Sequence, residues 1–268
     1  VIETGGSWSR SNWDGKTRRT GQSEGMAERA LLQRATRKRK APYIRASRRR
    51  VPVPPDLVLS RLGPVYGPVQ WRPRMDPLDE LIFTVLTQHT SDLNAGRAFK
   101  AMRGHYPAWH DVLGASAEAL ADTIKTGGLA NQKAPRIQHI LAEILRRHGH
   151  FDLAFLAAMP MDEAKAWLRA LPGVGPKTAA VVLAFSFGMP AMPVDTHIHR
   201  VSKRLGLISK KTSAEDAHDI LEAMLRPEDR FRAHVLLITH GRRTCKAQRP
   251  LCGQCALNDV CPSKEAPG

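Results

Sequence analysis

The four cysteines of the chain all lie in one short segment, with the spacing Cys245-x6-Cys252-x2-Cys255-x5-Cys261. Two disulfides within so short a segment would constrain very little of the chain, because disulfides stabilise most when they close long loops. Four thiolates at such spacing are instead a common metal-binding set. We therefore expect the four sulfurs to converge on one metal centre. The spacing alone does not separate zinc from an iron–sulfur cluster.

A second chemically informative segment is the run LPGVGPK at residues 171–177. Two glycines around an apolar residue predict a tight hairpin with accessible backbone N–H groups, and Pro176 fits the first turn of a helix over residues 178–187. A hairpin that leads into a helix N-terminus is a phosphate-binding arrangement. Taken alone, the same run is equally typical of an ordinary helix connector. The run VDTH at residues 194–197 follows it, with Asp195 placed to cap a further helix.

The elements that must position these residues are predicted to be helices. Apolar residues recur at helical spacing in three sets: Leu78, Leu81, Ile82, Val85 and Leu86; Ala134, Ile137, Ile140, Leu141, Ile144 and Leu145; and Ala217, Ile220, Leu221, Met224 and Leu225. We expect Ser213 to cap the third helix, and we assign the short apolar run 235–238 to a helix as well. Aromatic residues make up only 6% of the chain, which disfavours a sheet-based fold. The sequence predicts an all-α fold.

The charge of the chain is strongly basic and unevenly distributed. Residues 1–54 contain 14 Lys and Arg against 4 Asp and Glu, whereas the rest contains 27 against 21. The first segment also lacks a sustained apolar stripe and ends among prolines. We expect it to be a basic, mostly disordered arm that contacts DNA. Two alternatives stay open, namely a solvated tail without a role and translation upstream of a start at Met26.

A formal net charge of +16 favours a polyanionic partner, with double-stranded DNA as the leading candidate. No segment approaches the roughly 18 apolar residues that a membrane span needs, and no secretory signal opens the chain. We therefore expect a cytoplasmic, nucleoid-associated protein of a prokaryotic cell. We further expect it to act as a monomer, without a membrane partner.

The 171–177 run, the 194–197 run and the cysteine spacing together resemble the endonuclease III family. This is a family of DNA glycosylase/AP lyases of the helix-hairpin-helix superfamily that carry a 4Fe–4S cluster. The resemblance covers roughly residues 55–262, with the three motifs in the family's order and spacing. It implies that Cys245, Cys252, Cys255 and Cys261 hold the cluster.

The resemblance also implies two helical domains that flank a DNA-binding cleft. One is a six-helix domain over residues 75–189 that contains the hairpin. The other joins residues 55–74 to residues 190–268 and carries the cluster.

The family's catalytic pair falls on Lys177 and Asp195. A lysine amine can attack C1′ of a damaged nucleotide, release the base and leave a Schiff base, which then allows β-elimination. The resemblance therefore implies base excision repair of oxidised pyrimidines in duplex DNA, with cleavage of the resulting abasic site. Without the joint pattern, Lys177 is an ordinary surface lysine and Asp195 an ordinary helix cap.

Further residues are implied to contact DNA. A base must leave the duplex to be reached, so side chains must fill the gap. The segments that match the family's gap-filling loops contain Gln88, His89 and Leu129. Here the sequence departs from the family, because His89 stands where the inserted Gln is expected and Ala130 stands where an aromatic residue is common. Simple core packing is the alternative for Leu129. The remaining implied DNA contacts are Gly173, Val174, Gly175, Thr196 and His197.

Two other functions are compatible with much of this pattern. One is a mismatch-directed glycosylase of the same superfamily, but such enzymes lack the lysine found at Lys177. The other is a non-catalytic DNA-binding module built on the hairpin and the cluster. The presence of both Lys177 and Asp195 argues against that alternative.

We predict that the basic arm adds affinity for DNA without adding specificity. Deleting residues 1–54 should flatten the slope of log affinity against log salt concentration, because fewer counterions are released on binding. The ranking of damaged substrates should not change. Binding titrations across a salt series measure both quantities, and an unchanged slope would mean that the arm is idle.

Overall fold

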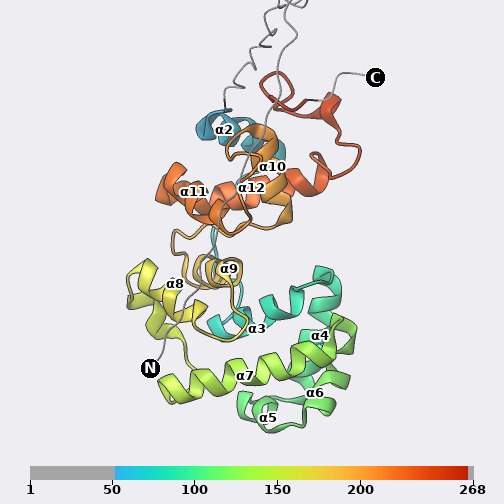
Figure 1. Ribbon diagram of the computed structural model, residues 1–268, viewed down its shortest axis with the longest axis vertical. Coiled ribbons are helices and arrows are strands. Elements are labelled where there is room, and N and C mark those ends of the chain that lie inside the picture. The colour runs from blue at the N-terminus through green and yellow to red at the C-terminus, as the bar shows by residue number, and fades with distance from the viewer. Residues whose placement is uncertain (1–51, 265–268) are drawn as a thin grey trace, which may run out of the picture. The chain divides into compact units, whose positions relative to one another are not determined.

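The computed structural model describes residues 52–264, and every regular element within them is a helix. The α-helices are α2 (Pro55–Tyr66), α3 (Pro77–Thr87), α4 (Asp92–His105), α5 (Trp109–Gly114), α6 (Ala117–Thr123), α7 (Ala130–His148), α8 (Met161–Arg169), α9 (Pro176–Phe187), α10 (Thr196–Leu205), α11 (Asp216–Met224) and α12 (Arg230–Arg243) (Figure 1). Short 3-10 turns lie between them, among them η1 (Lys125–Gly127). The predicted all-α class is confirmed. In this part of the chain no helix is both long and apolar enough to cross a bilayer.

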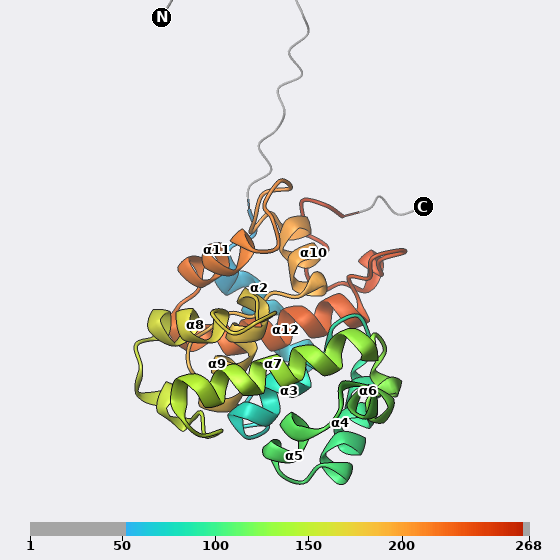
Figure 2. The same cartoon turned by 60° about the horizontal axis from the view of Figure 1, so that its bottom comes forward.

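Helices α3 to α9 enclose one hydrophobic core. The predicted stripe of α3 is fully buried in it at Leu78, Leu81, Ile82, Val85 and Leu86. Helix α9 packs against both α3 and α8, and α7 runs across this group beside α3 and α6 (Figure 2). Residues 178–184 of α9 are all buried. The position of this helix is therefore fixed by close packing on most of its surface.

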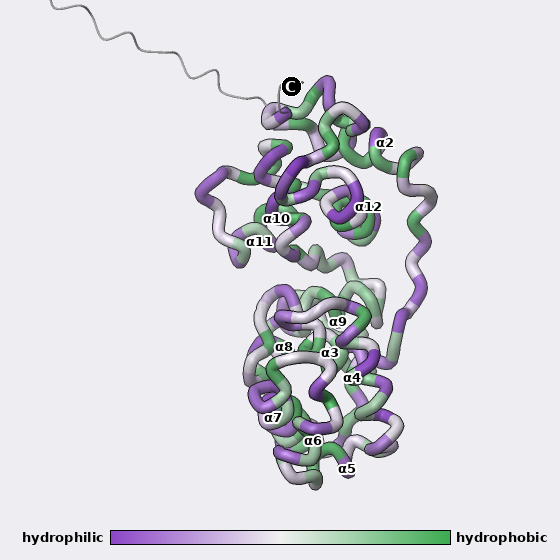
Figure 3. The backbone as a smooth tube through the Cα atoms, turned by 90° about the vertical axis from the view of Figure 1, so that its right-hand side faces the viewer, coloured by the Kyte–Doolittle hydropathy of each residue, from purple (hydrophilic) through white to green (hydrophobic). Residues whose placement is uncertain are grey.

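Helices α2, α10, α11 and α12 form a second core from segments that lie far apart in the sequence. Helix α12 packs against both α2 and α10, and it includes the run 235–238, which confirms the predicted helix there. Figure 3 shows the two groups of helices separately, with α2, α10, α11 and α12 in one and α3 to α9 in the other. The chain passes between them through residues 67–76 and residues 188–195.

The predicted domain division is not tested by these observations. Residues from 49 onward cluster as one compact unit, so a division into 75–189 and 55–74 plus 190–268 stays a prediction. The prediction for the basic arm lies outside the described residues, apart from residues 52–54.

The inner face predicted for α11 is partly wrong. Ala217, Leu221 and Leu225 are buried, but Ile220 and Met224 are each 38% exposed. The helix also begins at Asp216 rather than directly after Ser213, although the Ser213 hydroxyl accepts the Asp216 N–H at 3.0 Å. Two polar residues of α11, His218 and Glu222, are buried instead of Ile220 and Met224, because each has a hydrogen-bond partner inside the molecule.

Polar side chains of α11 and α12 bind the backbone of the crossing at residues 190–193. The four contacts are Arg230 Nη1 to the Pro190 carbonyl at 2.7 Å, His218 Nδ1 to the Met192 carbonyl at 2.9 Å, the Met192 N–H to Glu222 Oε1 at 2.8 Å, and His234 Nδ1 to the Pro193 carbonyl at 2.8 Å. Glu222 also forms an ion pair with Lys165 of α8. Buried polar groups stay buried only when they are paired in this way. Residues 190–193, which lead to Asp195, are thus hydrogen-bonded to side chains of α11 and α12.

We predict a loss of stability as the pH falls below about 6.5. Burial lowers the pKa of the His234 imidazole to about 4 and also lowers the pKa of His218, whereas an unfolded histidine titrates near 6.5. The unfolded chain therefore binds more protons than the folded chain between pH 4 and pH 6.5. The free energy of unfolding should rise with pH across that window and decline as the pH drops.

Urea unfolding of wild type, His234→Gln and His218→Gln at pH 7 and pH 5 measures this effect. Glutamine keeps a donor for the carbonyl and removes the titration, so both variants should lose less stability than wild type on acidification. The exposed His105→Gln variant is the control and should follow wild type. An identical pH dependence in all four proteins would contradict the prediction.

Candidate active site

The hairpin at residues 171–177 leads directly into α9. Gly173 has φ of +74°, a conformation that side chains disfavour, and a Cβ there would lie 2.7 Å from Cδ of Arg136. Val174 is buried beneath the turn, whereas Gly175 is the residue before the helix and Pro176 occupies its first position. The arrangement presents the N-terminus of α9, with its positive dipole end, next to an exposed Lys177.

Lys177 and Asp195 line the same pocket, which has a volume of about 380 Å³. Asp195 caps α10, and its Oδ1 accepts the N–H of Ile198 at 2.8 Å. The side chain of Asp195 is half-buried, whereas that of Lys177 is exposed. The other residues around the pocket are Arg74, Met75, Phe83, Thr84, Thr87, Asp92, Val181, Phe185, His234, Val235, Ile238 and Arg242. Such a volume lies within the usual range for a small-molecule site.

Charged groups of both signs face this pocket. Arg242 of α12 forms an ion pair with Asp92 of α4 at 2.9 Å. The pKa of His234 is about 4 because of burial first, and Lys177 and Arg74 lower it further while Asp195 opposes them. His234 is therefore neutral at pH 7. Its Nδ1–H faces the Pro193 carbonyl, which leaves Nε2 as an acceptor.

The two loops predicted to fill the gap in DNA contain strained residues. His89 and Leu129 have φ of +55° and +50°, in the left-handed region that non-glycine residues rarely adopt. His89 is exposed, and Leu129 is 46% exposed, which contradicts core packing for Leu129. Gln88 instead turns back toward α7, where its Oε1 accepts a hydrogen bond from Arg136 Nη1 at 3.0 Å. Of the two neighbours, His89 occupies the exposed position.

The lysine at position 133 connects these two loops, and sequence reasoning missed it. Lys133 is only 2% exposed, and its Nζ donates to the Leu86 carbonyl at 2.8 Å and to the Gly127 carbonyl at 2.7 Å. The first carbonyl precedes His89 and the second precedes Leu129. Burial lowers the pKa of Lys133, and Arg136 lowers it further. The available signal was its spacing, because Lys133 falls four residues before Ile137 on the buried stripe of α7.

Thr196 and His197 lie next to Asp195 but do not line the pocket. Thr196 is exposed. His197 packs closely against Gly241 of α12, because a Cβ added to Gly241 would lie 2.8 Å from the Cβ of His197. His197 Nδ1 also accepts a hydrogen bond from Arg200 at 3.2 Å. The structure thus brings Lys177 and Asp195 together and places these two residues beside them.

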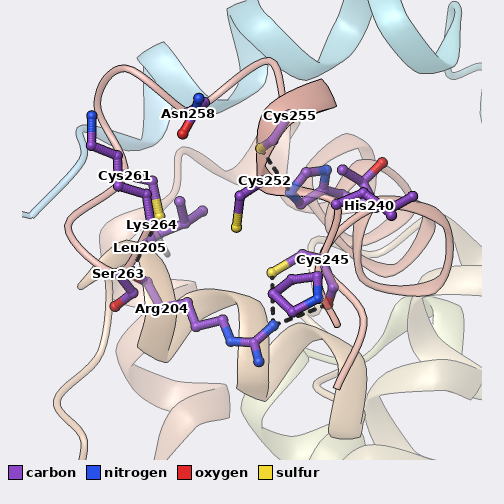
Figure 4. A pocket seen from close by; sticks show the side chains of 13 residues that line it. Arg204, Leu205, His240, Cys245, Cys252, Cys255, Asn258, Cys261, Ser263 and Lys264 are labelled. Carbon is purple, nitrogen blue, oxygen red and sulfur yellow. Dashed lines mark hydrogen bonds between the residues drawn. The ribbon is translucent and has the colours of Figure 1, made fainter. Parts of the chain in front are cut away.

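The four cysteines line one pocket in the C-terminal loop, and Figure 4 shows them around a common space. Arg204 Nη1 donates to Cys245 Sγ at 3.3 Å, and the Leu257 N–H donates to Cys255 Sγ at 3.4 Å. Burial, with smaller effects of the other cysteines, raises the pKa of the Cys255 and Cys261 thiols.

Within residues 52–264, no three His, Cys, Asp or Glu side chains lie close enough to hold one metal ion. A zinc site would need all four ligands on a single ion. A 4Fe–4S cluster places each thiolate on a different iron. The four thiols that line the pocket are a donor set that both groups use.

Comparison with known proteins defines the class. Residues 82–227 match the HhH-GPD superfamily of base excision DNA repair proteins, and residues 245–261 match the iron–sulfur binding domain of endonuclease III. An endonuclease III of Thermotoga maritima is 39% identical over 187 residues, which cover 69% of this chain and 83% of that protein. The solved structure of a trapped endonuclease III–DNA covalent intermediate superposes with a TM-score of 0.68 at 31% identity, covering 78% of this chain and 94% of the other.

The chain therefore belongs to the endonuclease III family of DNA glycosylase/AP lyases, acts in base excision repair and carries a 4Fe–4S cluster. A relative from Arabidopsis thaliana is 34% identical over 185 residues, which cover 69% of this chain and 60% of that protein. Because a plant protein is among the relatives, the comparisons do not support the prediction of a prokaryotic source.

We predict that Lys133→Met destabilises the protein and loosens both strained loops. Two carbonyls lose a charged donor, so the free energy of unfolding should fall by roughly 2 kcal/mol or more. Hydrogen exchange should accelerate around residues 89 and 129. The exposed Lys100→Met on α4 is the matched control and should change stability by less than about 0.5 kcal/mol. Unchanged exchange in both loops would show that Lys133 does not restrain them.

Proposed function

We propose that this enzyme removes oxidised pyrimidines from duplex DNA with Lys177 as the nucleophile and Asp195 as the electrostatic partner. The observation that supports this is that both side chains line one pocket of about 380 Å³. Lys177 stands in the first turn of α9, where the hairpin would bind the DNA backbone. The pocket beside it has room for an everted nucleotide.

The chain's own residues account for each step. The Lys177 amine forms a bond to C1′ while the bond from C1′ to the base breaks, and the base leaves with a proton. Asp195 stabilises the positive charge that develops on the sugar. Opening of the sugar ring gives a Schiff base with Lys177, which makes the C2′ proton acidic. Loss of that proton and of the 3′ phosphate then cleaves the strand by β-elimination.

The proposed DNA contacts come from the hairpin, the N-terminus of α10 and the two strained loops. Gly173, Val174 and Gly175 present the hairpin backbone to a phosphate, together with the N-terminus of α9. Thr196 and His197 lie at the adjacent N-terminus of α10 and contact the same strand. His89 and Leu129 enter the stack that the everted nucleotide leaves, while Gln88 supports the loop through Arg136.

The ligands of the cluster are Cys245, Cys252, Cys255 and Cys261. The donors fit, because four thiols from one loop face a common space, and Cys245 and Cys255 accept N–H groups from Arg204 and Leu257. When bound, the cluster supplies four iron–sulfur bonds that cross-link residues 245–261. Independently of the cluster, Arg204 of α10 holds the start of this loop, because it donates to the Lys246 carbonyl at 2.6 Å.

The proposal extends to the domain organisation of the protein, its oligomeric state and the compartment in which it works. Residues 75–189 and residues 55–74 plus 190–268 act as the two domains that flank the DNA. The enzyme acts as a monomer on damaged or abasic duplex DNA, and it works in the compartment that holds that DNA. The exposed Lys177 in the pocket disfavours both the mismatch-directed enzyme and the non-catalytic module.

We predict that Lys177→Gln abolishes the covalent adduct with DNA. Borohydride should trap wild-type protein on DNA that contains an oxidised pyrimidine or an abasic site, because it reduces the imine. The variant should lose trapping and strand cleavage by at least roughly 10³-fold and still bind DNA. The exposed Lys210→Gln is the matched control and should trap normally. An adduct formed by Lys177→Gln would assign the chemistry to another amine.

Asp195→Asn separates charge from helix capping in the same assay. Asparagine remains a good cap for α10, so the fold should persist. Base release should slow by roughly 10²- to 10³-fold, since a charge aimed at the transition state is removed. A variant with the wild-type rate of base release would exclude an electrostatic role for Asp195.

A further inference from the structure

A guanidinium in the pocket has no part in the mechanism above. Arg74 lines the pocket together with Lys177 and Asp195. It belongs to residues 67–76, the connection that runs from α2 to α3 in Figure 3. Neither the glycosylase step nor β-elimination uses it. Its surroundings nevertheless fix it in place more firmly than a surface arginine.

The backbone on which Arg74 stands is bound to α9. The Arg74 N–H donates to the Phe185 carbonyl at 3.2 Å, and Trp71 Nε1 donates to the Ala184 carbonyl at 2.8 Å. Since residues 178–184 of α9 are buried, these two bonds attach the connection to a rigid element. The Cα of Arg74 is therefore positioned by the same helix that carries Lys177.

The side chain of Arg74 is bound to a buried carboxylate. Its Nε donates to Glu80 Oε2 at 2.8 Å, and its Nη2 forms a close ion pair with Glu80 Oε1. The Glu80 side chain is 0% exposed and also accepts from Thr84 Oγ1 at 3.3 Å. A carboxylate buried this deeply needs its partner, so the guanidinium cannot leave without a large cost.

Two aromatic rings complete the placement. The guanidinium carbon lies 4.6 Å from the ring centre of Phe185 and 5.4 Å from that of Phe83, within the range of cation–π contacts. The side chain of Arg74 is still 40% exposed. Among the hydrogen bonds of residues 52–264, none uses its Nη1. One edge of a fixed, donor-only group thus remains available at the pocket.

We propose that Arg74 reads the everted base by donating from Nη1 to the 4-carbonyl of the ring, and so selects pyrimidine-2,4-diones over 4-aminopyrimidines. This inference rests on the proposed function and deepens it by naming the substrate class. A guanidinium has donors and no acceptor. A 4-carbonyl therefore pairs with it, whereas a 4-amino group faces it donor to donor. A site built to pair one group rejects its isostere because a buried polar group is left unpaired.

The test uses a matched substrate pair, 5-hydroxyuracil and 5-hydroxycytosine, each placed opposite guanine in the same duplex. They differ at C4, where one has a carbonyl and the other an amino group, and at the adjacent N3, which carries a hydrogen only in 5-hydroxyuracil. Single-turnover excision rates give a ratio for each protein. Any difference in how easily the two bases leave the duplex is common to all proteins and cancels when the ratios are compared.

Arg74→Met alone would leave Glu80 buried and unpaired, so the informative variant is Arg74→Met with Glu80→Leu. The ratio of 5-hydroxyuracil to 5-hydroxycytosine excision should fall by roughly tenfold, the size of one charged hydrogen bond. In this double variant, excision of 5-hydroxyuracil should slow several-fold more than cleavage at a pre-formed abasic site, which has no base for Arg74 to contact. Arg72→Met is the control, because Arg72 is a nearby exposed arginine that does not line the pocket. Its ratio should match wild type.

Arg74→Lys is a second variant that keeps the charge beside Glu80 and removes the planar fork. It should lose the same preference with a near-normal melting temperature, so the test survives if the double variant fails to fold. An unchanged ratio in Arg74→Lys overturns the proposal, and so does an equal loss on both bases and on the abasic site. A wild-type protein that excises neither base would instead contradict the proposed function itself.

Discussion

Helix α9 is buried along residues 178–184, and the positions of Lys177 and Arg74 follow from that burial. Its first turn carries Lys177 directly after the hairpin. Its last turn supplies the Ala184 and Phe185 carbonyls that hold the 67–76 connection and hence Arg74. Because close-packed cores do not deform continuously, the backbone positions of Lys177, the proposed nucleophile, and of Arg74, the group proposed to read the base, keep a constant separation along one rigid element.

The second fixed relation is between Lys177 and Asp195, which stand on helices from the two different cores. The chain joins those cores through residues 188–195, and the middle of this crossing is bound by Arg230, His218, Glu222 and His234. Neutral histidines are suited to this task, since Nδ1–H donates to a carbonyl without burying a charge. A network of buried hydrogen bonds thus positions the Asp195 carboxylate, for which a catalytic role is proposed.

The spacing of apolar residues predicted the buried face of a helix where that face is apolar. All five apolar residues of the predicted α3 stripe are buried, so a 3.6-residue repeat was sufficient to identify them. The same rule was wrong for α11, because Glu222 is buried by pairing with Lys165 and Met192, which are 57 and 30 residues away. Lys133 and Arg74 were also missed. The spacing of Lys133 places it on the buried face of α7, but periodicity does not identify the two carbonyls that Lys133 binds or the buried Glu80 carboxylate that Arg74 binds. The 171–177 run and the cysteine spacing were recognisable because their geometry is local.

The extent to which each functional group is held by its neighbours matches its proposed task. Asp195 is half-buried and bonded to the Ile198 N–H, and a charge that stabilises a transition state is most effective when it does not need to reorganise. Lys177 is exposed on a flexible stem, as suits its proposed role as an amine that moves to C1′ and remains attached while the sugar ring opens. His89 and Leu129 need the opposite property. Each left-handed residue costs roughly 1–3 kcal/mol, and only a fixed support such as Lys133, bound to both loops, allows them to stay in that conformation before DNA arrives.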